Sequence, residues 1–104
     1  MNDSGSTLSA PMIPSAVEEF AAEKGVAPYV GAVLDVARQA FPSSDVRMSI
    51  GRDPEDEQHR YIALDVEVGG QATVELLAGQ RRWSTGISRV CPSRYAVYFV
   101  LGWR

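Results

Sequence analysis

Residues 46–68 have the sequence VRMSIGRDPEDEQHRYIALDVEV, whose alternating pattern predicts the centre of the sheet. Apolar and polar side chains alternate over residues 46–50, and they alternate again over residues 62–68. A period of two is typical of a β-strand that turns one face toward the core. The connection between the two segments is polar and rich in acidic residues. The pattern therefore predicts two strands that pair as an antiparallel hairpin.

Two helices are predicted before this hairpin. Ser15 and Glu18 have the spacing of a capping box, which predicts a short helix that ends near Gly25. Pro28 suits the first turn of a second helix, and Pro42 ends it. Apolar residues at spacings of three and four form the buried stripe of this second helix: Val30, Val33, Leu34, Ala37 and Phe41.

A third helix and a last strand are predicted after the hairpin. The helix starts at about Gln71, and Gly86 weakens it by about 1 kcal/mol relative to alanine. Its predicted inner face consists of Leu76, Trp83, Ile87 and Val90, with Leu77 beside them. Pro92 breaks the chain before a strand over Tyr95–Trp103 that is apolar on both faces. Its predicted core side comprises Tyr95, Val97, Phe99, Leu101 and Trp103.

The order of elements is α-α-β-β-α-β, which predicts an α+β fold with the helices packed on a small three-stranded sheet. Residues 15–104 form a single domain in this prediction, and residues 1–14, which lack apolar periodicity, form a disordered tail. A right-handed crossover would place the last strand at one side of the sheet, parallel to the second strand. Because that strand is uncharged and apolar on both faces, an exposed edge would invite aggregation, so we expect it to be covered. It either pairs on both sides within the monomer or pairs with the same strand of a second copy, and the placement at one side of the sheet favours the homodimer.

Length and composition restrict the class of protein. The chain has 104 residues, of which 45% are hydrophobic and 22% charged, as in a small globular domain. The uncharged stretch Tyr95–Trp103 is nine residues long, against roughly 20 for a membrane-spanning helix. A single cysteine excludes an internal disulfide, and the N-terminus has no apolar signal segment. These observations predict a cytoplasmic protein with no membrane partner.

Charge is distributed unevenly along the chain, whose net charge is −3. Residues 1–75 carry all thirteen acidic residues and five basic ones, a net charge of −8, whereas residues 76–104 carry +5. Arginine offers a planar fork for carboxylates and phosphates, so the basic interaction candidates are Arg81, Arg82, Arg89 and Arg94. The simpler alternative is that Arg81, Arg82 and Arg89, with Glu75 near the helix start, only complement the dipole of the third helix.

The polar connection of the hairpin holds the acidic interaction candidates Asp53, Glu55, Asp56 and Glu57. A solvated hairpin loop is the simplest explanation of these four residues, but four crowded carboxylates can also present a negative surface to a basic partner. The loop lacks the glycine and the terminal glutamate of a calcium site, so we expect no metal. No phosphate-binding motif is present, and we expect no cofactor.

Catalytic residues cannot be assembled from the pattern. His59 is the only histidine and Cys91 the only thiol, and no motif joins either of them to a base or a nucleophile. The leading hypothesis is a small bacterial-type, non-catalytic interaction or accessory protein that works through protein–protein contacts. The alternative is a nucleic-acid-binding module that uses the arginines, and an enzyme is the third hypothesis.

Overall fold

The computed structural model describes residues 13–104 of the chain. Helices α2 (Ser15–Lys24) and α3 (Ala27–Ala40) precede strands β1 (Val46–Asp53) and β2 (Asp56–Val66). They are followed by α4 (Thr73–Val90), the short helix α5 (Ser93–Ala96) and β3 (Phe99–Trp103). The predicted α+β class and the order α-α-β-β-α-β are confirmed, with α5 as an additional turn of helix.

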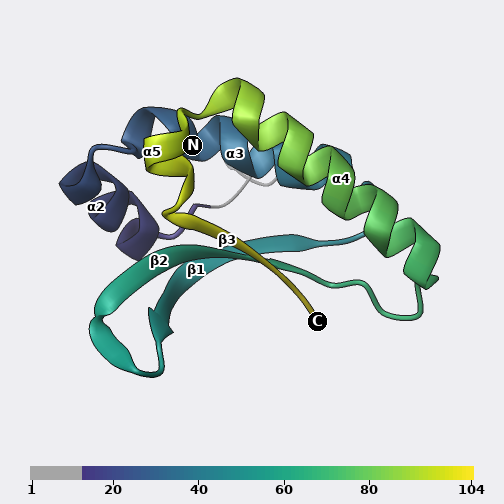
Figure 1. Ribbon diagram of the computed structural model, residues 1–104. Helices are drawn as coiled ribbons and strands as arrows, with labels where there is room; N and C mark the ends of the chain where they lie inside the picture. The colour runs from purple at the N-terminus through teal and green to yellow at the C-terminus, as the bar shows by residue number, and fades with distance from the viewer. Residues whose placement is uncertain (1–12) are drawn as a thin grey trace, which may run out of the picture.

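The sheet has the strand order β1-β2-β3. β1 and β2 form the predicted antiparallel hairpin, with Val46 opposite Val66. β3 runs parallel to β2, with Ile62 opposite Phe99, and it lies at the edge as the crossover predicts. The helices lie on one side of the sheet and leave its other side open (Figure 1).

The core lies between the sheet and the helices. On β2, the side chains of Ile62, Leu64 and Val66 are completely buried, which confirms the predicted inward face of this strand. The other buried residues of the core cluster are Val17, Phe20, Ala21, Val26, Val30, Val33, Leu34, Ala37, Ala40, Phe41, Met48, Trp83, Cys91 and Phe99. The stripe predicted for the second helix is therefore the buried face of α3.

Local signals set most of the helix ends. Gly25 follows α2 with a left-handed φ of 76°, and Pro28 lies in the first turn of α3, as predicted. The predicted capping box at Ser15 is wrong, because the residue that caps α2 is Pro14 and no side chain caps the helix. The carbonyl of Pro14 accepts from Glu18 N at 3.1 Å, so Ser15 is already the first helical residue.

Helix α4 begins at Thr73 instead of at Gln71. A carboxylate oxygen of Glu75 accepts a 3.3 Å hydrogen bond from the backbone N of Ala72, just before the helix. The side chain of Gln71 instead donates to the hydroxyl of Ser44, at the end of the α3–β1 connection. This long-range contact holds Gln71 outside the helix, where sequence periodicity alone would have continued it.

Two glycines of α4 face α3. A Cβ atom on Gly86 would lie 2.6 Å from Cγ1 of Val36, and one on Gly79 would overlap the ring of Phe41. Both glycines thus let α3 approach closely, and Gly86 is more than a weak point of the helix. Of the inner face predicted for α4, only Trp83 is fully buried, while Leu76, Ile87 and Val90 are half-buried and Leu77 is 51% exposed.

The predicted strand Tyr95–Trp103 is too long by its first four residues. The carbonyl of Pro92 accepts from the backbone N of Tyr95 and of Ala96, which closes the turn of α5. The ring of Tyr95 packs on Tyr29 with centroids 5.6 Å apart, and this contact fixes the turn against α3. The alternation also fails at the ends of the segment, where Val97 and Trp103 are exposed although both were predicted on the core side.

The predicted tail, residues 1–14, falls mostly outside the described residues. Ile13 is half-buried against the core cluster, and Pro14 precedes α2. Residues 1–12 lie outside the part of the chain that the structure describes. Over residues 13–104, no helix has the length and apolar character needed to cross a membrane.

Candidate functional site

A groove between α3 and α4 brings together three of the four predicted arginines. We call it the basic groove, and its lining residues are Val36, Gln39, Ala40, Arg81, Arg82, Thr85, Gly86 and Arg89. The volume of the groove is about 390 Å³. Its lining contains no acidic side chain, and within it the side chain of Val36 on α3 lies close to Gly86 on α4.

Arg82 is already engaged within the fold. Its Nη2 and Nε donate to the carbonyl oxygen of Ala40 at 2.6 and 3.1 Å. Ala40 ends α3, so the guanidinium satisfies a carbonyl that has no partner inside the helix and adds a positive charge at the negative end of its dipole. Arg82 therefore has a structural role at one end of the groove.

Arg81 and Arg89 project into solvent along the same stripe of α4. With Thr85 they have the spacing i, i+4 and i+8, which places the two guanidinium groups on one helix face with Cα atoms about 12 Å apart. Both side chains are exposed, and neither forms an ion pair among the described residues. Their donors are therefore available to a ligand.

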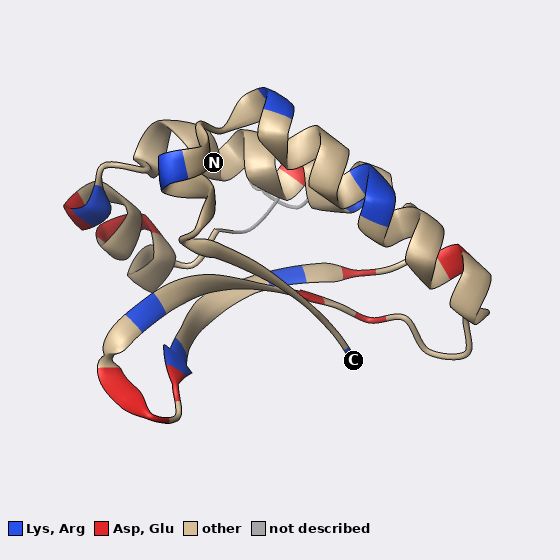
Figure 2. Cartoon of the chain, in the orientation of Figure 1, with Lys and Arg blue, Asp and Glu red and all other residues tan. Residues whose placement is uncertain are grey.

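Arg94 does not line the groove. It lies on α5, where its guanidinium stacks 5.0 Å from the ring centroid of Tyr95. Figure 2 shows basic positions along α4 and, apart from them, on α5. The four arginines predicted together thus divide into the three of the groove and one stacked on an aromatic ring.

The acidic candidates lie in and beside the turn between β1 and β2. Asp53 Oδ1 accepts from the backbone N of Glu55 at 2.9 Å, and Asp56 Oδ1 accepts from Gln58 at 3.1 Å. Aspartate side chains commonly stabilise turns in this way, so half of the cluster serves the hairpin itself. The turn lies far from α4 (Figure 2). Within residues 13–104, no group of three or more potential ligands is arranged to hold a metal ion.

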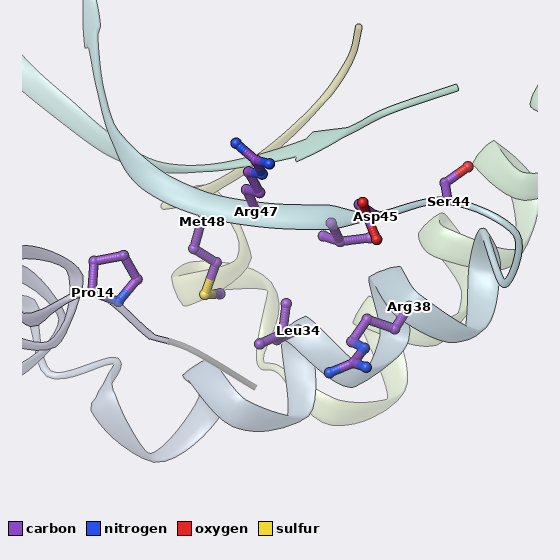
Figure 3. Close-up of a pocket in the computed structure, with 8 residues that line it drawn as sticks. Pro14, Leu34, Arg38, Ser44, Asp45, Arg47 and Met48 are labelled. Carbon is purple, nitrogen blue, oxygen red and sulfur yellow. The ribbon is translucent and has the colours of Figure 1, made fainter. Parts of the chain in front are cut away.

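A second hollow of about 500 Å³ lies between α3 and β1. Leu34 and Met48 point into it, but Arg47 points away from it on the other side of β1 (Figure 3). The guanidinium of Arg38 points away from β1. Because its charged groups do not converge on one point, this hollow is a less suitable binding site than the basic groove.

The histidine and the cysteine stand apart from the groove. His59 is exposed on β2 close to the hairpin turn, and Cys91 is buried in the core after α4. Burial raises the pKa of the Cys91 thiol, and its Sγ lies 3.6 Å from the carbonyl oxygen of Pro92. A buried thiol with a raised pKa is a poor nucleophile.

The basic groove supplies hydrogen-bond donors and positive charge, which suits the binding of an anionic group.

Sequence reasoning missed the α3 side of the groove. Val36, Gln39 and Ala40 were not candidates, because nothing in a linear pattern shows which face of α3 meets α4. On α4 the spacing of Arg81, Thr85 and Arg89 is a signal of one helix face that the sequence does contain.

No protein-family model matches the chain, and no curated protein or solved structure shows significant similarity to it.

Proposed function

We propose that the protein is a non-catalytic interaction protein and that its basic groove binds an acidic segment of a partner protein. One observation carries the proposal: three arginines of α4 line a groove that has no carboxylate in its lining. Arg82 is held by Ala40, whereas Arg81 and Arg89 are exposed and form no ion pair within residues 13–104. Arginine pairs with carboxylates through two parallel hydrogen bonds, and its weak hydration suits it to interfaces.

The apolar residues in the lining of the groove favour a protein as its ligand. Val36, Ala40 and Gly86 supply the apolar part of the lining, beside the arginines of α4. Interfaces between proteins combine an apolar centre with a polar rim, and arginine is enriched in them. A helix or extended segment with carboxylates about 12 Å apart would pair with Arg81 and Arg89. Its apolar side chains would then contact the apolar part of the lining.

The nucleic-acid alternative has less support. Aromatic side chains that would stack on bases are occupied in the fold: Trp83 is 6% exposed, and Tyr95 packs on Tyr29. Trp103 is exposed, but it belongs to the sheet and does not line the groove. A nucleic acid longer than the groove would also meet the net negative charge of the rest of the molecule, which a short acidic segment in the groove would not.

Charge reversal at the groove tests the proposal. A fluorescent glutamate-rich peptide is titrated with the wild type and with the double variant Arg81→Glu and Arg89→Glu. The matched control, Arg47→Glu and Arg52→Glu, changes the net charge equally on exposed positions of β1. We expect the peptide to bind at least about tenfold more weakly to the groove variant, while the control retains affinity.

A nucleic acid serves as the competing probe in the same experiment. If duplex DNA binds and the glutamate peptide does not, the alternative function replaces the proposal. A steep loss of DNA affinity with rising salt would then show contacts with phosphates. Equal binding of the peptide to the wild type and to the groove variant would show that the groove is not its site.

Self-association through the C-terminal strand is a second proposed contact, independent of the groove. It is supported by the position of β3 at the edge of the sheet and by its uncharged sequence.

We also propose that the protein acts in the cytoplasm. This location is supported by the single thiol of Cys91, which has no second cysteine with which to form an internal disulfide.

A further inference from the structure

The backbone of β3 has one bonded side and one free side. The carbonyl oxygen of Tyr98 accepts from Ile62 N at 2.7 Å, and Arg104 N donates to the carbonyl of Val66 at 2.8 Å. In a parallel pair, alternate residues of a strand bond to the neighbour. The backbone groups of Phe99, Leu101 and Trp103 therefore point away from β2, and no strand within residues 13–104 pairs with them.

The free side of β3 lacks the features that protect natural sheet edges. The other edge strand, β1, carries the charged residues Arg47, Arg52 and Asp53, and its register is irregular at the last two of these. Charges and irregular register are common ways to keep an edge strand from pairing. Phe99–Trp103 contains no charge, and the side chains of Val100 and Trp103 are both 42% exposed.

We infer that a second copy of the chain covers this edge, with the two β3 strands antiparallel about a two-fold axis at Leu101. In this register the free backbone groups of all three outward residues, Phe99, Leu101 and Trp103, meet those of the other strand. Leu101 then faces Leu101 of the second copy, and Phe99 faces its Trp103. Each of these opposed pairs exchanges two backbone hydrogen bonds. The contact is self-complementary and joins two three-stranded sheets into a single continuous one.

The sequence of β3 is complementary to itself in this register. Trp103 lies opposite Phe99 of the second copy on the helical side of the sheet, and aromatic cross-strand pairs are favourable. On the open side, Val100 lies opposite Gly102, whose missing side chain leaves room for it. Arg104 is the nearest charge, and it faces Tyr98 instead of a like charge, while its own guanidinium lies 3.4 Å from Asp65. A second copy therefore fits the edge better than a partner strand of charged sequence.

Removal of a single edge donor tests the dimer. Trp103→Pro deletes an N–H that points to the free edge and leaves the bonds to β2 in place, and proline is tolerated at such edge positions. Val100→Lys places two like charges near the two-fold axis. In sedimentation experiments at about 100 µM we expect wild-type dimers and a dissociation constant at least about tenfold higher for both variants. Ser93→Lys, an exposed substitution on α5, is the matched control and should remain dimeric.

Amide hydrogen exchange distinguishes this register from other contacts. The amides of Leu101 and Trp103 should be protected in concentrated wild-type protein and should exchange rapidly after dilution. The amides of Val100 and Gly102 bond to β2 and should stay protected in both samples, which also shows that the fold is intact. A wild-type monomer at about 100 µM, or a dimer whose Leu101 amide exchanges freely, would overturn the inference.

The inference rests on the proposed self-association and not on the basic groove. The groove variant Arg81→Glu with Arg89→Glu should therefore lose the glutamate peptide and still form the dimer. Conversely, Trp103→Pro should dissociate the dimer and still bind the peptide. The two proposals thus fail separately.

Discussion

The ring of Phe41, at the end of α3, lies so close to Gly79 of α4 that a Cβ atom on the glycine would overlap it. Phe41 is 2% exposed, and Gly79 is one of the two fully buried positions of α4. The two helices therefore approach each other closely at this point, next to Ala40 in the lining of the basic groove.

We predict that Gly79→Ala lowers the free energy of unfolding by about 1 to 2 kcal/mol. The added methyl group forces the ring of Phe41 to move, and overpacking of this kind costs about 1 to 3 kcal/mol. Better helix propensity returns up to about 1 kcal/mol. Denaturant unfolding monitored by circular dichroism measures the change. Gly31→Ala, which has open space around its Cβ on α3, should instead stabilise the protein by up to about 1 kcal/mol.

Arg82→Ala should destabilise the protein, whereas Arg81→Ala should not. The guanidinium of Arg82 donates two hydrogen bonds to the carbonyl of Ala40, and we expect a loss of about 1 kcal/mol without them. Arg81 is exposed and unpaired among the described residues, so its removal should change stability by less than about 0.5 kcal/mol. Equal unfolding midpoints for the two variants would contradict the capping role of Arg82.

Truncation of the central strand should have the largest effect on stability. Leu64 and Val66 are completely buried on β2, and Leu64→Ala should cost about 2 to 5 kcal/mol, with a smaller loss for Val66→Ala. Thermal unfolding gives the comparison. Glu67→Ala, one residue further along the chain and exposed, is the control and should stay within about 0.5 kcal/mol of the wild type. A register displaced by one residue would reverse this order.

Cys91 should react slowly with thiol reagents in the folded protein. Burial raises its pKa, so the unreactive thiol form persists to higher pH than in the unfolded chain. The folded protein favours the protonated form of Cys91 more than the unfolded chain does. The stabilisation that this preference provides is fully present below the pKa of the thiol in the unfolded chain. It is lost as the pH rises through the raised pKa of the thiol in the folded protein. Labelling with Ellman's reagent at neutral pH should become fast only after guanidinium is added. Fast labelling of the native protein would show that the site opens.

Local patterns were sufficient for the order of the elements and for the hairpin. The period of two over residues 46–50 and 62–68 reports which side chains are buried, and the strands formed there face the core as predicted. The left-handed Gly25 and the early Pro28 act through their own backbone dihedrals, so their effect does not depend on distant residues. The edge position of β3 also followed from the right-handedness of crossover connections between parallel strands.

Contacts between distant residues decided the remainder. Tyr95 was assigned to a strand by its apolar neighbours, but its packing on Tyr29 holds it in a helical turn. The arginines of α4 were visible in the chain, yet only the docking of α3 separates Arg82, bound to Ala40, from the exposed Arg81 and Arg89. Periodicity shows that a side chain is buried or exposed. It does not show which element it meets, because that depends on how the helices dock against each other and on the sheet.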